Sequence, residues 1–325
     1  MPWDVPFIFI FVTEIFNLES GVIIKSTGSL YRVLNSKGIA ISCSVKGKLR
    51  IKVLPTTNPI AVGDNVLFEL DNKTNTGVIT EVLDRRNYIL RKASNLSRQS
   101  QIIAANIDQV FLMVTIILPE TPYEFIDRFL IAAEAYRVPA RIIINKTDLY
   151  VEEEIKKMQY MESVYNTIGY ECIRLSLYEE TNLEILEALM KNKISLISGN
   201  SGVGKSTLLN TFNPSLKLKT AKISEYHKQG KHITTFPEMH LMPFGGFVID
   251  TPGIRGFGVV DMEREEIYHF FPEIFRISKD CRFNNCLHLD EPDCMVRKAV
   301  ESGEINFSRY RSYLNIMEGD NRKYR

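Results

Sequence analysis

Gly199-Asn200-Ser201-Gly202-Val203-Gly204-Lys205-Ser206 is the stretch of this 325-residue chain that decides its central fold. It matches the pattern G-x-x-x-x-G-K-[ST], an apolar run over 194–198 precedes it, and Thr207 opens a helical segment behind it. The glycines allow backbone N–H groups to turn inward around phosphate oxygens, at a helix N-terminus that already favours anions. We therefore expect a nucleotide phosphate site over 199–207, with Lys205 at the β- and γ-phosphates and the Ser206 hydroxyl on Mg²⁺.

The base of that nucleotide is indicated by Asn145-Lys146-Thr147-Asp148, which ends a strand expected over 141–144. The Asp148 carboxylate can accept hydrogen bonds from the N1–H and the amine of guanine, whereas adenine would leave this charge unpaired. Asn145 would support the loop and N7, and the stem of Lys146 would cover the ring. Ser176, which follows a strand over 172–175, is expected in the loop that brackets the base. The motif therefore predicts guanine.

A third motif, Asp250-Thr-Pro-Gly253, follows the apolar strand over 247–249. Asp250 would hold the Mg²⁺ shell and the Gly253 N–H would contact the γ-phosphate, as in GTPase switches. Before it lies Gly230-Lys-His-Ile-Thr-Thr235, where Thr234 or Thr235 can complete the magnesium site. Spacing does not choose between the two threonines; Thr235 joins Ser206 and Asp250 in the expected ligand set.

Water activation is the point at which these motifs differ from a common GTPase. Ile254 stands where many GTPases carry a glutamine that orients the attacking water, and an aliphatic side chain cannot do this. We therefore expect slow intrinsic turnover. His232 is the candidate catalytic residue because an imidazole can position or deprotonate water; a solvated loop histidine is the alternative.

The motifs stand in an unusual order, because the base motif precedes the phosphate loop. Strands expected over 109–115, 141–145, 171–176 and 194–198 alternate with helices expected over 123–136, 151–167 and 182–191. Such alternation predicts a mostly parallel sheet covered by helices. The same site forms in a circularly permuted chain, since domain termini commonly lie close together.

A cluster of metal-ligand residues follows the enzyme motifs. Cys281-x₄-Cys286-x-His288-x₅-Cys294 offers three sulfurs and one nitrogen within fourteen residues. Zn²⁺ favours this tetrahedral donor set, and four protein ligands leave no open position for a reactive water. We expect one structural zinc ion per chain; buried thiols beside a surface histidine are the alternative.

Charge is sorted along a chain whose formal net charge is only +1, with 40 Lys and Arg against 39 Asp and Glu. This balance excludes a globally basic coat protein. Short strands expected over 21–25, 31–34, 39–45, 49–53, 66–70 and 77–82 predict an OB-fold barrel. Residues 21–60 contain no Asp or Glu and seven basic side chains, which favour RNA over the alternative of a solvated face: Lys25, Arg32, Lys37, Lys46, Lys48, Arg50 and Lys52. A second acid-free stretch begins with Arg85 and Arg86.

The sequence also bears on location. No apolar run approaches the roughly 18 residues of a membrane-spanning helix. The run over 7–12 lacks the basic flank of a signal peptide, and five cysteines do not fit a secreted disulfide framework. We expect a cytoplasmic monomer with no membrane association.

From Gly21 onward the chain resembles the circularly permuted, ribosome small-subunit-dependent GTPase A family (RsgA, also called YjeQ). The resemblance rests on the barrel, the linker at 85–91, Ala105-Asn-Ile-Asp-Gln, the permuted motifs and the cysteine cluster. It implies GTP hydrolysis stimulated by the small ribosomal subunit during its late maturation. It also implies barrel and zinc domains that contact rRNA, and His232 matches the family's proposed catalytic histidine. The family loop usually reads His-Thr-Thr-Thr, and here Ile233 replaces the first threonine.

These inferences divide the chain into four parts. Residues 1–20 are an extension without assigned structure, 21–92 an OB-fold RNA-binding domain, 93–262 a circularly permuted α/β P-loop GTPase domain, and 263–325 a mostly helical zinc-binding domain. The alternatives are a permuted GTPase of large-subunit assembly, a nucleotide-binding RNA scaffold with little turnover, and a P-loop ATPase or kinase.

Overall fold

A computed structural model describes residues 18–28, 30–45, 60–71, 73–92, 100–220, 237–250 and 262–318. The chain forms two compact units, each assembled from three segments of sequence. The first draws on 1–110, 183–198 and 208–252, and the second on 111–182, 199–207 and 253–325. Among the described residues, no helix has both the length and the apolar character needed to cross a membrane.

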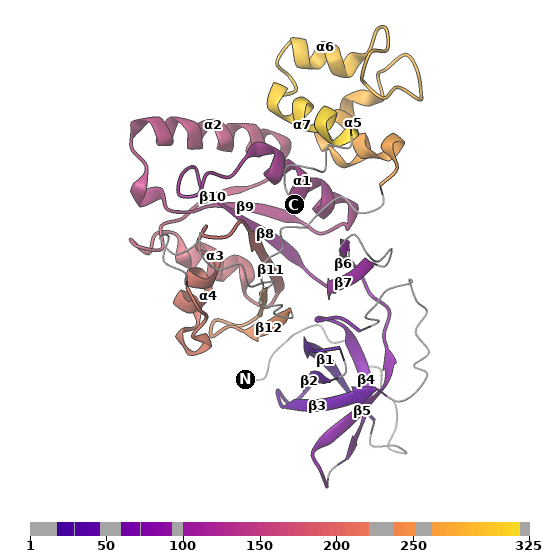
Figure 1. Ribbon diagram of the computed structural model, residues 1–325, viewed down its shortest axis with the longest axis vertical. Coiled ribbons are helices and arrows are strands. Elements are labelled where there is room, and N and C mark those ends of the chain that lie inside the picture. Colours follow the sequence, from indigo (N-terminus) through magenta and orange to yellow (C-terminus); the bar gives the residue numbers. More distant parts are fainter. Residues whose placement is uncertain are drawn as a thin grey trace, which may run out of the picture. The chain divides into compact units, whose positions relative to one another are not determined.

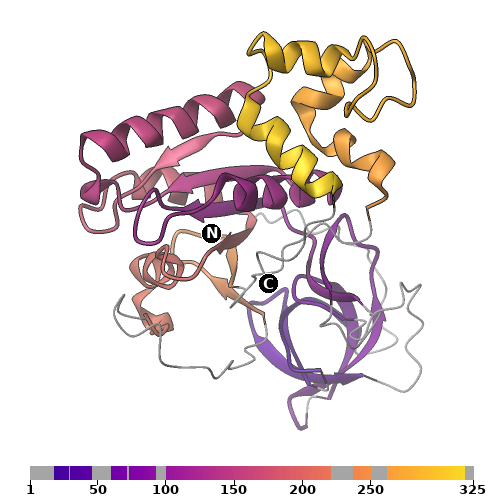
Figure 2. The same ribbon diagram turned by 45° about the horizontal axis from the view of Figure 1, so that its top comes forward.

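The first unit begins with a closed five-stranded barrel. Its strands are β1 (Leu18–Ser26), β2 (Tyr31–Asn35), β3 (Ala40–Val45), β4 (Asn65–Asp71) and β5 (Thr76–Val82). They follow the order β1-β2-β3-β5-β4, and β4 pairs back onto β1 to close the ring seen in Figure 2. The expected barrel is confirmed, and the strand expected over 49–53 lies outside the described residues.

Alternation of side chains explains why these strands close around a core. In β2, Tyr31 and Val33 are buried while Arg32 between them is exposed, the period of two that gives a strand one apolar face. The core of the barrel collects these inward positions: Ile23, Tyr31, Val33, Ile41, Cys43, Ile60, Val66, Phe68 and Ile79.

The first unit continues with β11 (Ile194–Gly199), β12 (Glu238–Leu241) and β13 (Phe247–Asp250). β13 pairs in parallel with β11 and antiparallel with β12. The sequence did not predict β12, a strand of four residues that also pairs with β1 where Lys25 stands opposite Glu238. There the Lys25 ammonium donates to the Glu238 carboxylate at 2.8 Å. The first unit also contains the antiparallel pair β6 (Tyr88–Lys92) and β7 (Ser100–Ala105), the helix α3 (Leu183–Met190) and the short helix η2 (Pro214–Leu216).

Two arginines after the barrel are engaged by carboxylates. Arg85 makes a two-pronged ion pair with the fully buried Asp64, with nitrogen–oxygen distances of 2.6 and 2.7 Å. Arg86 donates to Asp108 at 2.8 Å and to the carbonyl of Asn106 at 3.0 Å. Paired guanidinium groups of this kind hold the backbone in place. We therefore assign Arg85 and Arg86 a structural role in the linker, which the acid-free stretch alone did not indicate.

The second unit contains a short sheet and its helices. β8 (Gln109–Val114), β9 (Ala140–Ile144) and β10 (Cys172–Arg174) are ordered β10-β9-β8, and β9 and β10 run parallel. α1 (Tyr123–Ala135) follows β8, and η1 (Thr147–Leu149) and α2 (Glu152–Ile168) follow β9. α2 lies beside β10 (Figure 1). Every residue of β8 is buried, as expected for a strand covered on both faces.

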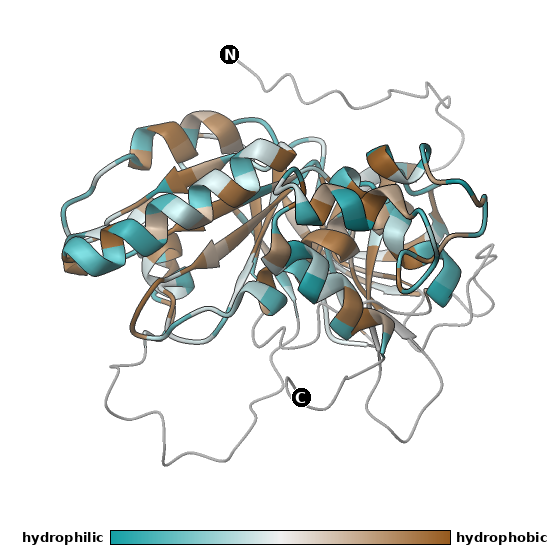
Figure 3. Ribbon diagram, turned by 90° about the horizontal axis from the view of Figure 1, so that it is seen from above, coloured by the Kyte–Doolittle hydropathy of each residue, from teal (hydrophilic) through white to brown (hydrophobic). Residues whose placement is uncertain are grey.

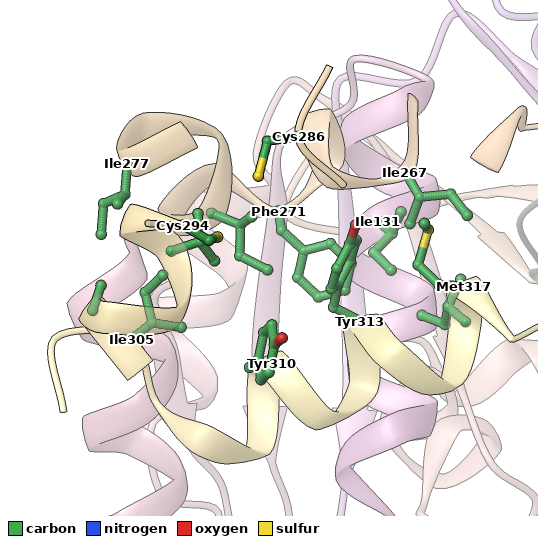
Figure 4. Packing of buried hydrophobic residues seen from close by; sticks show 14 residues of the cluster. Ile131, Ile267, Phe271, Ile277, Cys286, Cys294, Ile305, Tyr310, Tyr313 and Met317 are labelled. Carbon is green, nitrogen blue, oxygen red and sulfur yellow. The ribbon is translucent and has the colours of Figure 1, made fainter. Parts of the chain in front are cut away.

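The C-terminal part of the second unit is helical, with η4 (Arg264–Phe270), α5 (Pro272–Ser278), α6 (Met295–Glu301) and α7 (Phe307–Met317). Its helices alternate between hydrophilic and apolar stretches (Figure 3), as helices that bury one face do. Figure 4 shows the core that these helices share. Phe271, Tyr310 and Tyr313 belong to the same buried cluster as Cys286 and Cys294. Ile131 of α1 belongs to the same core.

A buried ion-pair triad joins this C-terminal part to α1. The guanidinium of Arg309 on α7 is fully buried and donates to Asp127 of α1 at 2.6 Å and to Glu273 of α5 at 2.7 Å. The guanidinium also lies over the ring of Phe271, 4.7 Å from its centre. Two carboxylates around one arginine satisfy charges that would be costly to bury alone. The triad therefore ties three helices together at one point.

Candidate functional site

The phosphate loop follows β11 and ends where α4 (Lys205–Phe212) begins. Gly199, Gly202 and Gly204 all have positive φ. A Cβ at Gly204 would lie 2.4 Å from the Asn145 side-chain nitrogen, so the close approach of these two loops requires glycine. The Lys205 ammonium lies inside the loop and donates to the carbonyls of Gly199 and Asn200 at 2.6 and 2.8 Å.

Asn145 joins the base motif to this loop. Its side-chain Nδ2 donates to the Val203 carbonyl at 2.8 Å, and its backbone N–H donates to the Val114 carbonyl at the end of β8 at 2.9 Å. The side chain is 1% exposed, and its Oδ1 has no hydrogen-bond partner among the described residues. The two motifs lie 58 positions apart in the sequence, so the fold brings them together.

Asp148 and Ser176, expected at the base and in the loop that brackets it, are hydrogen-bonded to each other. The Ser176 hydroxyl donates to Asp148 Oδ1 at 2.7 Å and accepts from the Glu179 N–H at 3.0 Å. Ser176 is completely buried, while Asp148 is half-buried. Thr147 anchors the same turn, because its hydroxyl donates to the Leu175 carbonyl at 3.1 Å. One carboxylate oxygen is thus oriented by the loop expected to bracket the base.

Lys146 contacts a segment that the sequence did not single out. It has a left-handed backbone, with φ of 65°, and its ammonium donates to the carbonyl of Leu118. Burial lowers the pKa of Lys146. Leu118 belongs to the segment 115–121 between β8 and α1, and Pro119 of this segment lies 3.5 Å from the point a Cβ would occupy at Gly202. The segment 115–121 therefore borders both nucleotide motifs.

Tyr150 is a second residue that sequence reasoning missed. Its ring is buried, its hydroxyl donates to the Asn145 carbonyl at 2.5 Å, and it accepts from the Ile116 N–H at 2.9 Å. Burial raises the pKa of Tyr150 to about 12, so the hydroxyl keeps its proton at neutral pH and donates. A tyrosine two positions after N-K-T-D carries no signal in a single sequence, because the role depends on Ile116, 34 positions away.

Of the remaining residues predicted to bind the nucleotide or its magnesium ion, Asp250 and Ser206 lie in the described part of the chain. Asp250 is the last residue of β13 and stands in register with Ile197, two positions before the phosphate loop begins. Ser206 lies in the first turn of α4. The predicted residues His232, Thr234, Thr235 and Gly253 lie outside the described residues.

The metal-ligand cluster is assembled as predicted from spacing. One ligand atom each from Cys281, Cys286, His288 and Cys294 lies within 4.8 Å of all the others. His288 Nδ1 is 3.6 Å from the sulfur of Cys281 and 3.5 Å from that of Cys294. Burial raises the pKa of the Cys286 thiol to about 12 and also that of Cys294, so a bound cation must displace their protons. The four side chains can hold a metal ion.

Backbone contacts around the cluster fix its shape. The Tyr310 hydroxyl donates to the His288 carbonyl at 2.6 Å, and that of Tyr313 donates to the Leu287 carbonyl at 2.5 Å. The Glu291 carboxylate accepts from the N–H groups of Leu287 and Leu289, both at 2.7 Å. Partners of this kind orient metal ligands, and mutating them weakens metal sites.

Of the seven basic residues predicted to bind RNA, three lie among the described residues. Arg32 and Lys37 are exposed, on β2 and in the turn after it. Lys25 is paired with Glu238, and both side chains are 37% exposed. Lys46, Lys48, Arg50 and Lys52 lie outside the described residues.

A phosphate loop hydrogen-bonded to an N-K-T-D motif that precedes it in the chain defines a circularly permuted GTPase. The RsgA GTPase family model matches residues 82–260, and that of the RsgA N-terminal domain matches residues 20–79. The chain belongs to the RsgA GTPase family and is a GTP hydrolase. The expected family and the expected permuted fold are both confirmed.

Individual relatives agree with this assignment. A Flavobacterium psychrophilum protein named small ribosomal subunit biogenesis GTPase RsgA is 52% identical over 308 residues, 94% of each chain. A Bacteroides thetaiotaomicron protein named small ribosomal subunit biogenesis GTPase RsgA 2 is 51% identical over 306 residues, 94% of this chain and 98% of that one.

Solved structures match along nearly the whole chain. YjeQ from Thermotoga maritima has a TM-score of 0.77 at 36% identity, over 93% of this chain and 98% of that one. YloQ, described as a circularly permuted GTPase, has a TM-score of 0.72 at 30% identity, over 95% of this chain and 97% of that one.

Proposed function

We propose that this chain binds the small ribosomal subunit and hydrolyses GTP to GDP and phosphate during the late maturation of that subunit. The observation that carries the proposal is the match, along 94% of both chains, to a relative named for small-subunit biogenesis. The closed barrel with its exposed Arg32 and Lys37 suits contact with a phosphate backbone.

Guanine selection is assigned to the base loops. Asp148, with one oxygen held by Ser176, would accept from the N1–H and amine of guanine, while Asn145 and Lys146 would support N7 and the ring face. Thr147 anchors this turn. The loop 199–207 would hold the phosphates, with Lys205 exchanging its carbonyl partners for phosphate oxygens.

Magnesium and water complete the proposed reaction. Ser206, Thr235 and Asp250 would hold Mg²⁺, and Thr234 and Gly253 would contact the nucleotide. Mg²⁺ supplies charge neutralisation at the β- and γ-phosphates when bound. Ser206, in the first turn of α4, fits a hydroxyl ligand of this ion. We assign water activation to His232, and the variant His232→Ala should lose stimulated turnover while it keeps GDP affinity; His240→Ala on β12 is the matched control.

We assign the metal of the cysteine cluster as zinc. Tetrahedral coordination with bonds of about 2.3 Å to sulfur and about 2.0–2.1 Å to nitrogen separates S and N by roughly 3.6 Å. The distances from His288 Nδ1 to the sulfurs of Cys281 and Cys294 are 3.6 and 3.5 Å, which fits this geometry. With four protein ligands the ion would be structural, and it would organise the proposed domain 263–325.

The proposed domain boundaries, RNA-binding face and location are consistent with a role in small-subunit maturation. We propose an RNA-binding barrel domain over 21–92, a GTPase domain over 93–262 and an extension over 1–20. Lys25, Arg32, Lys37, Lys46, Lys48, Arg50 and Lys52 would form the RNA face. We also propose that the chain is a cytoplasmic monomer without membrane association, which suits a factor that binds maturing ribosomal subunits in the cytoplasm.

Turnover measurements with ribosomal subunits test the proposal. GTP hydrolysis by the full chain is measured alone, with purified small subunits and with purified large subunits. We expect slow turnover alone and stimulation by small subunits only. Stimulation by large subunits only would make the chain a large-subunit factor, and no stimulation by either would favour an RNA scaffold with little turnover.

A further inference from the structure

Tyr150 stands between two loops that both reach the nucleotide motifs. Its side chain is 7% exposed, and its one hydroxyl donates to the Asn145 carbonyl at 2.5 Å while it accepts from the Ile116 N–H at 2.9 Å. Asn145 and Ile116 are 1% and 5% exposed. The hydroxyl is therefore the bridge between the base motif and the segment 115–121 inside the protein.

The segment 115–121 is closed on itself by hydrogen bonds between its own residues. The Thr115 hydroxyl donates to the Pro119 carbonyl at 2.5 Å. The Thr115 N–H donates to the Thr121 hydroxyl at 3.1 Å, and the Thr121 N–H donates back to the Thr115 carbonyl at 3.0 Å. Connected hydrogen bonds of this kind rigidify a loop.

The far side of the segment meets the nucleotide residues. The Lys146 ammonium donates to the Leu118 carbonyl, and Pro119 approaches the phosphate loop at Gly202. Tyr150 is thus connected to Lys146 by two routes. One runs through the backbone of Asn145, the residue before Lys146, and the other runs through Ile116 and the segment to Leu118.

We propose that Tyr150 is a positioning residue for guanine, whose hydroxyl sets the spacing between the N-K-T-D loop and the segment 115–121. The inference rests on the proposed assignment of N-K-T-D to the base. Tyr150 need not touch the nucleotide, because its effect passes through Asn145 and Lys146. Without the hydroxyl, a buried carbonyl and a buried N–H lose their partners, and the two loops relax apart.

The variant Tyr150→Phe tests this with the loss of a single oxygen. GDP, IDP and ADP compete with a fluorescent GDP analogue for the full chain; IDP lacks only the exocyclic amine of guanine. We expect GDP affinity to fall about 5–50-fold, because the relaxed loops must be brought back to their spacing when GDP binds. The preference for GDP over IDP should shrink, KM for GTP should rise, and kcat should change little, because the lost interaction is made equally in substrate and transition state.

Tyr170→Phe is the matched control. Tyr170 is 5% exposed and its hydroxyl donates to Glu134 at 2.9 Å, so this variant also removes the hydrogen-bonded hydroxyl of a buried tyrosine, but one that bonds to neither loop. We expect its thermal unfolding temperature to fall as that of Tyr150→Phe does, with unchanged GDP affinity. Thr121→Val loosens the same segment at its other end, and it should weaken GDP binding in the same direction.

Three outcomes distinguish the proposed role of Tyr150 from the assignment of the N-K-T-D motif to guanine. If Asp148→Ala keeps the preference for GDP over ADP, the guanine assignment itself fails. If Asp148→Ala loses this preference while Tyr150→Phe binds GDP and IDP like the unmodified chain, the role of Tyr150 alone is overturned. Equal affinity losses in Tyr150→Phe and Tyr170→Phe would reduce Tyr150 to a general stabilising residue and would also overturn it.

Discussion

The base loops and the cysteine cluster are held together in opposite ways. In the base loops, each key side chain is bonded to another part of the chain: Asn145 to Val203, Asp148 to Ser176 and Lys146 to Leu118. In the cluster, the sulfurs of Cys281 and Cys294 face the His288 ring. Hydrogen bonds between segments of the chain therefore set the geometry of the base loops, whereas in the cluster the proposed zinc ion would in addition join all four side chains.

The largest expected effect comes from removing that ion. Chelation of the metal should lower the melting temperature of the helical part over 262–318 by about 10 °C or more, because structural metal binding contributes several kcal/mol to folding. Circular dichroism and elemental analysis for one zinc per chain check this.

Two variants sharpen the same contrast. Cys294→Ser should lose the metal, while Cys172→Ser, outside the cluster, should keep it. GDP affinity of the metal-free chain should be retained. If GDP binding disappears together with the metal, the contrast between the two regions is wrong.

Next in size is the triad that joins α1 to α7. Arg309→Met leaves Asp127 and Glu273 buried without their cation, and it should cost about 3–5 kcal/mol of unfolding free energy in urea. Arg128→Met on the same helix as Asp127 removes a more exposed pair with Glu124 and should cost about 1 kcal/mol or less. Equal costs for the two variants would show that the triad is not a structural centre.

The phosphate loop offers a test with a matched glycine. Gly204→Ala brings a Cβ within 2.4 Å of Asn145 Nδ2 at φ of 112°, whereas Gly169→Ala meets nothing within 4 Å at the same φ. Both should lose about 1 kcal/mol of stability from backbone strain. Only Gly204→Ala should also weaken GDP binding, by about tenfold or more, because the loops must separate. Calorimetric titration with GDP distinguishes them.

The smallest effect is expected at Ser176, in the loop that brackets the base. Ser176→Ala removes the donor to Asp148 and the acceptor of the Glu179 N–H, so GDP affinity should fall about 3–10-fold. Ser278→Ala, an exposed serine bonded to the Phe275 carbonyl, is the control and should leave GDP affinity unchanged. An unchanged GDP affinity in Ser176→Ala would mean that Asp148 keeps its orientation without the hydrogen bond from Ser176.

Local patterns in the sequence were enough for the barrel, the α/β order and both motif clusters. The G-x-x-x-x-G-K-S loop and the Cys-His spacing are short, and each is read within a few residues. In each case the signal lies close to the residue concerned.

What the sequence did not reveal depends on distant partners. Tyr150 gains its role from Ile116, Arg85 from Asp64 and Arg309 from Asp127, at separations of 34, 21 and 182 positions. β12 was missed because four residues, Glu238–Leu241, are too short for a periodic signal and its pairing partners lie elsewhere. Long-range pairing has no local pattern.

The sequence separation between Asp127 and Arg309 also determines how long after Asp127 the ribosome adds Arg309 to the chain. At about 5–20 residues per second, the ribosome makes Arg309 roughly 10–40 s after Asp127. Tyr165, only 38 positions after Asp127, donates to the same carboxylate oxygen at 2.8 Å and can occupy it early. α1 therefore acquires Arg309 as a partner only after 182 further residues have been added to the nascent chain.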